Sequence, residues 1–146
     1  MTDIISGELK PDLDASSADS ETASAVTIIV CSSCRYPGTP AETFPRPGSA
    51  LADATREAAA DSTVDVRQVA CLGNCKRGLS AAVLRAGSWS YIFGELDTDN
   101  AADLVAGAEL FAGSSDGFMP FRNRPEALKR GLIARVPTAA NLQDLK

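Results

Sequence analysis

Two short apolar runs rich in β-branched residues stand out along the chain, and each of them ends at a cysteine. Residues 25–30 read Ala-Val-Thr-Ile-Ile-Val and lead to Cys31, whereas residues 64–70 lead to Cys71. Short runs of this kind, without helical spacing, are typical of strands in the interior of a sheet. The first run predicts a central strand covered on both faces, and the second predicts a strand beside it.

Helical spacing of apolar residues appears in two other segments. Residues 49–60 are rich in alanine, and Leu51, Ala54 and Ala58 fall on one face. Residues 99–112 carry a second set of apolar residues at the spacing of a helix that packs on a core. Both segments predict amphipathic helices.

The remaining regular pattern is a pair of alternating segments, residues 79–85 and 89–94, which predicts a hairpin across Ala86-Gly87. The predicted order is therefore strand, helix, strand, strand, strand, helix. Two strands that flank a helical crossover are expected to be parallel. The order predicts an α/β protein with a mixed four-stranded sheet, the βαββα core of a shortened thioredoxin-like fold.

The regions outside this core are polar or rich in proline. Residues 35–48 contain four prolines and two glycines and predict a long loop. Residues 1–24 are acidic and poor in large apolar groups, which predicts a disordered tail. Residues 116–146 are basic and interrupted by prolines, so we expect an irregular extension with one short helix over residues 125–130.

Charge and hydropathy narrow the class of protein. The six acids and one lysine of the tail account for the whole formal charge of −5, so the rest of the chain is neutral. A neutral domain lacks the basic footprint of a nucleic-acid-binding protein. We find no apolar run long enough to cross a membrane and no secretory signal, so we expect a cytoplasmic protein without a membrane partner.

The four cysteines are the residues with distinctive chemistry, and the chain has no histidine. They form two close pairs, Cys31 with Cys34 and Cys71 with Cys75, separated by thirty-six residues. In the cytoplasm such pairs indicate metal or redox chemistry more often than structural disulfides. The absence of histidine excludes zinc sites with histidine ligands, Rieske clusters and Cys–His nucleophile pairs within this chain. We therefore predict a centre with four thiolate ligands and no catalytic residue.

Three kinds of site fit two cysteine pairs. A reactive dithiol at Cys31 and Cys34 is disfavoured, because a proline-rich loop and not a helix follows Cys34. Structural zinc suits four thiolates, although a domain of this size has a core of its own. A 2Fe–2S cluster takes four thiolates, two to each iron, and is the interpretation that we favour.

Residues near the cysteines are suited to stabilise a negatively charged cluster. Glycines at positions 73 and 78 allow backbone N–H groups to approach sulfur, and serines at positions 32 and 33 offer hydroxyl donors. Positive charge is available from Arg35, Lys76 and Arg77. Such groups would tune the reduction potential of a cluster.

Two stretches carry a resemblance to known families. Cys71-Leu-Gly-Asn-Cys75 after a strand resembles the second cluster loop of thioredoxin-like 2Fe–2S ferredoxins, although that family has a much longer spacing between its first two cysteines. The string from Asp116 to Gly131, with Ala134-Arg-Val-Pro137 and the first cysteine pair, resembles a family of small bacterial four-cysteine proteins described as metal-binding and ferredoxin-like. The second resemblance covers residues 25–138, and its members are often encoded among cobalamin-synthesis or metal-transport genes.

The resemblance implies a specific function. It implies that residues 25–115 form a cluster-binding domain, that all four cysteines are ligands of a 2Fe–2S cluster, and that the protein is a one-electron carrier and not an enzyme. It also implies a redox partner protein, not identified by the sequence, and a homodimer. Independently of the resemblance, the charge of the basic extension predicts a solvated tail packed along the domain. The alternative for this segment is a surface that docks an acidic partner or covers the cluster, with Phe118 and Phe121 as anchors. A metal-binding accessory module, with zinc or another metal, is the alternative to the electron carrier.

Overall fold

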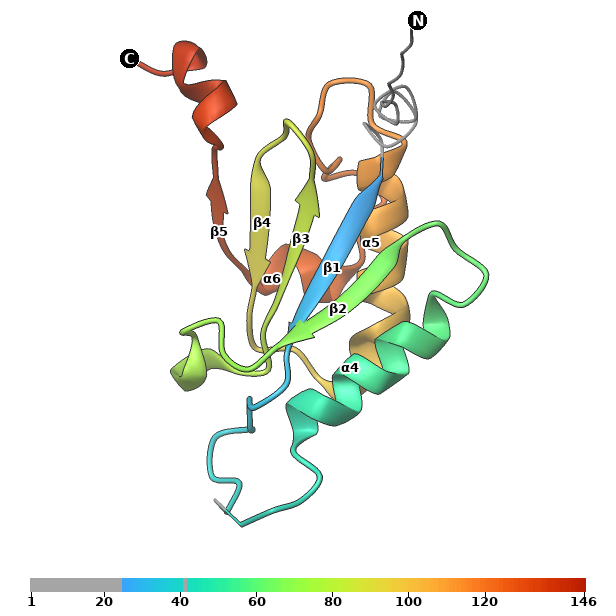
Figure 1. Cartoon of the computed structure of the whole chain (residues 1–146), viewed down its shortest axis with the longest axis vertical. Coiled ribbons are helices and arrows are strands. Elements are labelled where there is room, and N and C mark those ends of the chain that lie inside the picture. The colour runs from blue at the N-terminus through green and yellow to red at the C-terminus, as the bar shows by residue number, and fades with distance from the viewer. Residues whose placement is uncertain (1–24, 41) are drawn as a thin grey trace, which may run out of the picture.

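The computed structural model describes residues 25–40 and 42–146 (Figure 1). The predicted disordered tail, residues 1–24, lies outside the described residues. Five strands form one sheet in the order β2-β1-β3-β4-β5. The strands are β1 (Val26–Cys31), β2 (Asp65–Val69), β3 (Ala81–Arg85), β4 (Ser90–Phe93) and β5 (Leu132–Val136).

The predicted parallel pair is confirmed. Strand β1 lies parallel to β2, with Thr27 opposite Asp65 and Cys31 opposite Val69. The connection runs through helix α4 (Pro47–Ala58), which has proline at its first position, where no backbone N–H is required. The predicted hairpin is also confirmed, since β3 pairs antiparallel with both β1 and β4.

The C-terminal extension is more regular than its sequence predicts. Helix α6 (Glu126–Arg130) confirms the expected short helix, and the residues after it form β5, which pairs antiparallel with β4. The sheet therefore has five strands and not four. The β5 sequence Leu-Ile-Ala-Arg-Val is short and largely exposed at the sheet edge, so it carries little of the alternation that identifies a half-buried strand.

Helices cover one face of the sheet. Figure 1 shows α4, α5 (Ala101–Ala112) and α6 on the same side, where α4 and α5 pack against each other and α5 packs on β1 and β3. Along β1, Val26, Ile28 and Val30 are buried, but the alternate residues Thr27 and Ile29 are only half-buried. The expectation that both faces of β1 are covered was therefore wrong. A nearly all-apolar run can therefore belong to a strand in the middle of a sheet even where helices cover only one of its faces.

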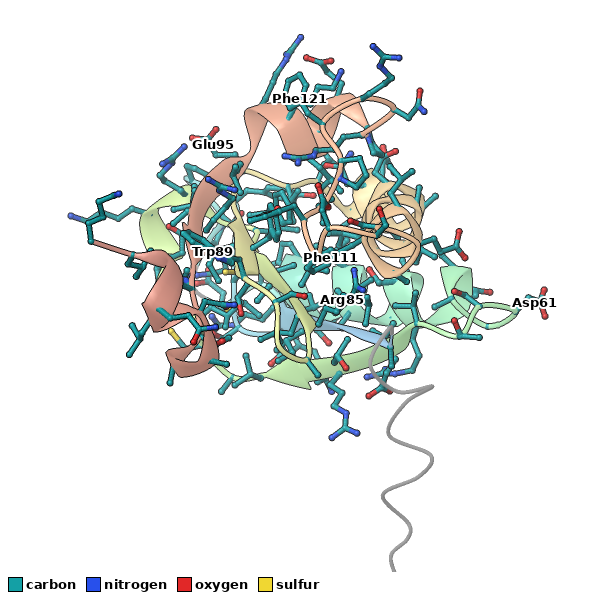
Figure 2. All side chains as sticks on the ribbon, turned by 90° about the horizontal axis from the view of Figure 1, so that it is seen from above. Asp61, Arg85, Trp89, Glu95, Phe111 and Phe121 are labelled. Atoms are coloured by element: carbon teal, nitrogen blue, oxygen red, sulfur yellow. The ribbon has the colours of Figure 1, made fainter. Side chains whose placement is uncertain are left out.

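The apolar core lies between the sheet and these helices. Tyr91 and Phe93 of β4 and Phe111 of α5 are almost fully buried, and the ring of Tyr91 packs edge-on against that of Phe111 at 5.2 Å. Arg85 closes this layer by donating to the carbonyl oxygens of Phe111 at 2.8 Å and Ser114 at 3.0 Å (Figure 2). These contacts lie at the upper end of the sheet in Figure 1, and the cysteine loops lie at the lower end.

Candidate metal centre

The parallel pairing of β1 and β2 places both cysteine pairs at one end of the sheet. Cys31 is the last residue of β1, and Cys34 lies in the turn that follows. Cys71 lies just beyond Val69, the last residue of β2, and Cys75 begins the short 3₁₀ helix η1 (Cys75–Arg77). Because carboxyl ends of parallel strands meet at one edge, the two loops leave the lower end of the sheet together (Figure 1).

Hydrogen bonds join the two loops directly. The backbone N–H of Ser32 donates to the carbonyl oxygen of Val69 at 2.8 Å, and the Ser32 hydroxyl donates to the same oxygen at 3.2 Å. The hydroxyl of Ser33 and the thiol of Cys31 both donate to the carbonyl oxygen of Ala70, the thiol at 3.7 Å. The two serines therefore connect the loops through backbone carbonyls, whereas the sequence suggested that they donate to sulfur. Only Ser33 is also near a sulfur, with its Oγ 4.0 Å from Cys31 Sγ.

The two cysteine pairs differ in burial. Cys31 is 1% exposed and Cys34 is 3% exposed, whereas Cys71 and Cys75 are exposed. The start of α4 lies against the first pair at Gly48. The second pair lies on a surface loop. The arrangement therefore has one protected side and one accessible side.

Within each pair, the two thiols lie close enough for one to shift the pKa of the other. Burial, followed by a hydrogen bond with Cys31, raises the pKa of Cys34 to about 11. Burial also opposes ionisation of Cys31, but hydrogen bonds from Cys34, the Leu72 backbone and Ser33 outweigh it and lower the Cys31 pKa. The pKa of Cys75 is raised by a hydrogen bond with Cys71 and then by the negative charge of that thiol. Within the first pair, Cys31 is therefore the thiol that ionises first.

Two glycines allow the backbone to approach the first cysteine pair closely. The N–H of Gly48 donates to the carbonyl oxygen of Cys34 at 2.9 Å, and a Cβ at this position would collide with the Cys31 carbonyl oxygen. A Cβ at Gly78 would lie 3.2 Å from Cys34 Sγ. The sequence did not reveal Gly48, because its contact depends on α4 folding back against a turn that lies fourteen residues earlier.

The second loop is held by a glycine and an asparagine. Gly73 has a φ of +79°, which favours glycine, and its N–H lies 3.2 Å from Cys71 Sγ, as the sequence suggested. The Asn74 amide donates to the Arg77 carbonyl oxygen at 3.2 Å and to the hydroxyl oxygen of buried Ser80 at 2.9 Å. Asn74 thereby anchors the exposed loop to the start of β3. The sequence suggested the role of Gly73 but not that of Asn74.

The positive charges are distributed differently from the expected pattern. Arg77 forms an ion pair with Glu95 at 3.1 Å, so its charge is offset locally. Arg46, which the sequence analysis missed, donates from NH1 to the Ser33 carbonyl oxygen at 3.0 Å. Within residues 25–40 and 42–146, Arg35, Arg46 and Lys76 form no ion pair with a carboxylate.

Tyr36 ties the proline-rich loop to the start of α5. Its hydroxyl accepts a hydrogen bond from the Thr98 N–H at 3.1 Å and donates to Asp97 at 3.4 Å. Asp97 in turn accepts from the Asp99 N–H at 3.1 Å and caps the short helix η2 (Thr98–Asn100). Tyr36 therefore attaches the proline-rich loop to the segment that leads into α5.

Phe118, in the C-terminal extension, lies far from the cysteines. That ring packs on Trp89 at 6.0 Å, next to the β3–β4 turn, which is at the opposite end of the sheet from the site. Phe118 therefore does not cover the cysteines. Arg124 is buried and donates to the carbonyl oxygens of Met119 and Pro120, and Arg130 pairs with Glu126 at 3.0 Å. Docking of an acidic partner on this extension stays a prediction, as does the homodimer.

The structure brings each cysteine pair together but does not gather a complete ligand set. Among the described residues, no group of three or more cysteine, aspartate or glutamate side chains is close enough to hold a metal ion. A centre with four ligands therefore requires the exposed loop to close on the buried pair. The structure also describes no helix long and apolar enough to cross a membrane.

Comparisons with solved structures show the fold. The thioredoxin-like [2Fe-2S] ferredoxin from Aquifex aeolicus is 16% identical, with a TM-score of 0.50 over 75% of this chain and 91% of that chain. A cysteine-to-serine variant of the same ferredoxin is also 16% identical, with a TM-score of 0.50 over 75% of this chain and 98% of that chain. At this identity the likeness establishes a thioredoxin-like fold and nothing finer.

Sequence comparison identifies the family. No curated protein matches the sequence. The family described as "Protein of unknown function (DUF1636)" matches residues 28–138, a range that includes all four cysteines and extends through β5. This match covers well over half of the chain, and the protein therefore belongs to the DUF1636 family.

Proposed function

We propose that the protein is a one-electron carrier that holds a 2Fe–2S cluster on Cys31, Cys34, Cys71 and Cys75. The observation that carries the proposal is the joining of the two cysteine loops at the carboxyl ends of β1 and β2, through Ser32, Ser33 and the carbonyl oxygens of residues 69 and 70. The fold shared with a [2Fe-2S] ferredoxin supports it.

The donor set fits this cofactor. All four candidate ligands are thiols, the ligands that iron–sulfur clusters take, and they come as two pairs whose members already interact. When bound, the cluster supplies reversible one-electron chemistry. The buried pair would exclude water on one side, while the exposed pair would leave a short path to a partner on the other.

Polar groups of the chain are placed to support thiolate ligands. The Gly73 N–H points at Cys71 Sγ from 3.2 Å, and hydrogen bonds from Leu72 and Ser33 already favour the ionised form of Cys31. Donors of this kind stabilise negative sulfur and tune reduction potential. In this proposal the protein passes electrons between partners and is not itself an enzyme.

A redox dithiol at Cys31 and Cys34 is the second candidate, because the structure removes the argument against it. The sequence places no helix after Cys34, but the fold returns the start of α4 to this turn, where the Gly48 N–H contacts the Cys34 carbonyl. The lowered pKa of Cys31 and the raised pKa of Cys34 also suit a dithiol with one reactive thiol. Structural zinc would use the same four thiols as the cluster.

One preparation distinguishes these candidates. The protein is purified without oxygen, its visible absorption and EPR spectra are recorded, and iron, sulfide and zinc are assayed on the same sample. Visible bands, an EPR signal after one-electron reduction and equal amounts of iron and sulfide support the carrier. A colourless protein that retains zinc, and that takes up no cluster after reconstitution with iron and sulfide, contradicts it.

A pair of double variants sharpens the distinction. If a cluster is bound, both Cys31→Ala/Cys34→Ala and Cys71→Ala/Cys75→Ala lose the visible bands. If the function is that of a dithiol, only the first variant loses the reversible two-electron oxidation, and the second variant retains it. Retention of the bands by either variant contradicts a cluster held by all four cysteines.

A further inference from the structure

A cavity of about 280 Å³ lies beside the cysteines, between the first cysteine turn and the proline-rich loop. Its wall contains only one member of each cysteine pair, Cys34 and Cys75, and neither Cys31 nor Cys71. The cavity therefore borders both cysteine pairs, at Cys34 and at Cys75. The other lining residues are Ser33, Arg35, Tyr36, Pro37, Gly38, Thr39 and Arg46.

The charges of this wall have a single sign. Arg35 and Arg46 both line the cavity, and no carboxylate does. In the part of the chain that the structure describes, neither arginine forms an ion pair. The single acid of the loop sequence, Glu42, is exposed and does not line the cavity. The positive charge of these two guanidinium groups is not offset by a carboxylate. It therefore attracts an anion into the cavity.

The cavity also has a preorganised donor. The half-buried Arg46 side chain is fixed by its hydrogen bond to the Ser33 carbonyl oxygen at 3.0 Å, which uses NH1. A guanidinium has five N–H donors in a rigid plane, so most of them remain for a ligand. The hydroxyl groups of Ser33 and Thr39 add neutral polar surface, although that of Ser33 already donates to Ala70.

We propose that this cavity binds a small oxyanion, a phosphate or carboxylate group, and that the bound anion lowers the reduction potential of the adjacent centre. The binding follows from the cavity and its two arginines alone. The effect on potential rests on the proposed function, because a fixed negative charge beside Cys34 and Cys75 opposes the addition of an electron. By linkage, reduction weakens binding of the anion to the same extent.

Binding is tested on the full chain with inorganic phosphate at constant ionic strength, by calorimetry and by amide chemical shifts. We expect saturable binding with shifts at residues 33–39 and 46. Arg46→Gln should weaken phosphate binding about tenfold or more, because it removes a charge-assisted hydrogen bond to the anion. Arg56→Gln is the matched control, because it removes the same charge from the other end of α4, and it should bind phosphate as the unaltered protein does.

Two further variants separate charge from folding. Arg46→Lys keeps the charge but loses the fixed guanidinium donors, so it should bind phosphate more tightly than Arg46→Gln and more weakly than the unaltered protein. Circular dichroism of every variant checks that the domain is folded. A shift that grows linearly with phosphate, or equal weakening by Arg46→Gln and Arg56→Gln, overturns the binding site. A parallel titration with citrate shows which oxyanion is preferred, since a carboxylate site binds citrate more tightly than phosphate.

The coupling to potential has its own readout. In the cluster-loaded protein, phosphate should move the reduction potential to more negative values and saturate over the concentrations that saturate binding, and Arg46→Gln should remove this dependence. Saturable binding without any shift of potential overturns the coupling. A protein that cannot be loaded with a cluster overturns the proposed function and the coupling but leaves the phosphate titration as an independent test of the site.

Discussion

Gly48 allows the first turn of α4 to lie directly on the backbone of the Cys31–Cys34 turn. A Cβ at this position would meet the carbonyl oxygen of Cys31 and would lie 2.9 Å from the Cys34 nitrogen, and neither atom belongs to a flexible side chain. The helix start and the buried cysteines are therefore fitted to each other. A change at Gly48 tests whether this fit is required.

We expect Gly48→Ala to destabilise the protein by about 1–3 kcal/mol, the usual cost of overpacking a well-packed region. Urea denaturation followed by circular dichroism measures the change in the free energy of unfolding. Gly113→Ala is the control, because its Cβ would lie 3.6 Å from the Glu109 carbonyl oxygen, an ordinary contact. If both substitutions have the same small effect, α4 does not depend on close approach at Gly48.

Asp116 is a residue whose charge is coupled to local structure. Its carboxylate accepts hydrogen bonds from the Ser114 hydroxyl at 2.6 Å and the Phe118 N–H at 3.0 Å, and these bonds lower its pKa. A carboxyl whose pKa is lower in the folded state stabilises that state above the unfolded pKa of about 3.9. The stabilisation is lost as the pH falls through the folded pKa.

We therefore expect an NMR titration of the Asp116 carboxyl to give a pKa below the ordinary aspartate value. Ser114→Ala removes the largest cause of the shift and should raise that pKa toward the ordinary value. An Asp116 pKa that is the same in both proteins would show that the hydroxyl does not stabilise the carboxylate in solution.

Spacing in the sequence singled out the two cysteine pairs, whose role as ligands stays a prediction, but it did not reveal Arg46, Gly48 or Asn74 near them. Two close cysteine pairs that follow two strand-like runs predict that the pairs lie at the same end of a sheet. The parallel register of β1 and β2 confirms that the two runs end together. The roles of these three residues depend on contacts made across loops: Arg46 with Ser33, Gly48 with Cys34, and Asn74 with Ser80. No local pattern marks such contacts, so they emerge only from the fold.

At the scale of elements, the packing of α6 on α5 defines how the C-terminal extension attaches. Leu128 is the buried residue of α6, and its Cδ1 occupies the space in which a Cβ at Gly107 would lie. A side chain of one helix thus fits against a glycine of the other. The sequence predicts α6 but not this pairing, because five residues contain too few apolar positions to define a face.

A double-mutant cycle tests this contact. Leu128→Ala should cost about 2–5 kcal/mol by leaving a cavity, and Gly107→Ala should destabilise the protein by colliding with Leu128. The double variant should be less destabilised than the sum, since the new methyl group enters the vacated space. Urea denaturation of the four proteins measures the coupling, and strict additivity would show that the two residues do not contact in solution.

At the scale of the whole molecule, the candidate centre meets the core on one side only, because Cys31 and Cys34 are part of the buried core. The large buried side chains lie between the sheet and its helices, whereas Cys71 and Cys75 are exposed at one end. The fold therefore has a source of stability that does not depend on a cofactor. This separates it from small metal domains that are unfolded without their metal.

We expect removal of bound metal by a chelator under reducing conditions to leave the protein folded. Far-UV circular dichroism should stay close to that of the untreated protein, and thermal unfolding should remain cooperative at a lower midpoint. The variant Cys71→Ala/Cys75→Ala serves as a control that cannot complete a four-thiolate site. Loss of secondary structure in both samples would mean that the thiols are structural.

The parallel pairing of β1 and β2 also means that the two cysteine pairs come near each other only after the chain has folded. Thirty-six residues separate Cys34 from Cys71, and in the unfolded chain these residues form a flexible loop whose closure is entropically costly. An unfolded or newly synthesised chain thus offers metal two independent two-thiol fragments. Formation of the sheet raises the effective concentration of one pair around the other, so tight metal capture becomes a property of the folded chain.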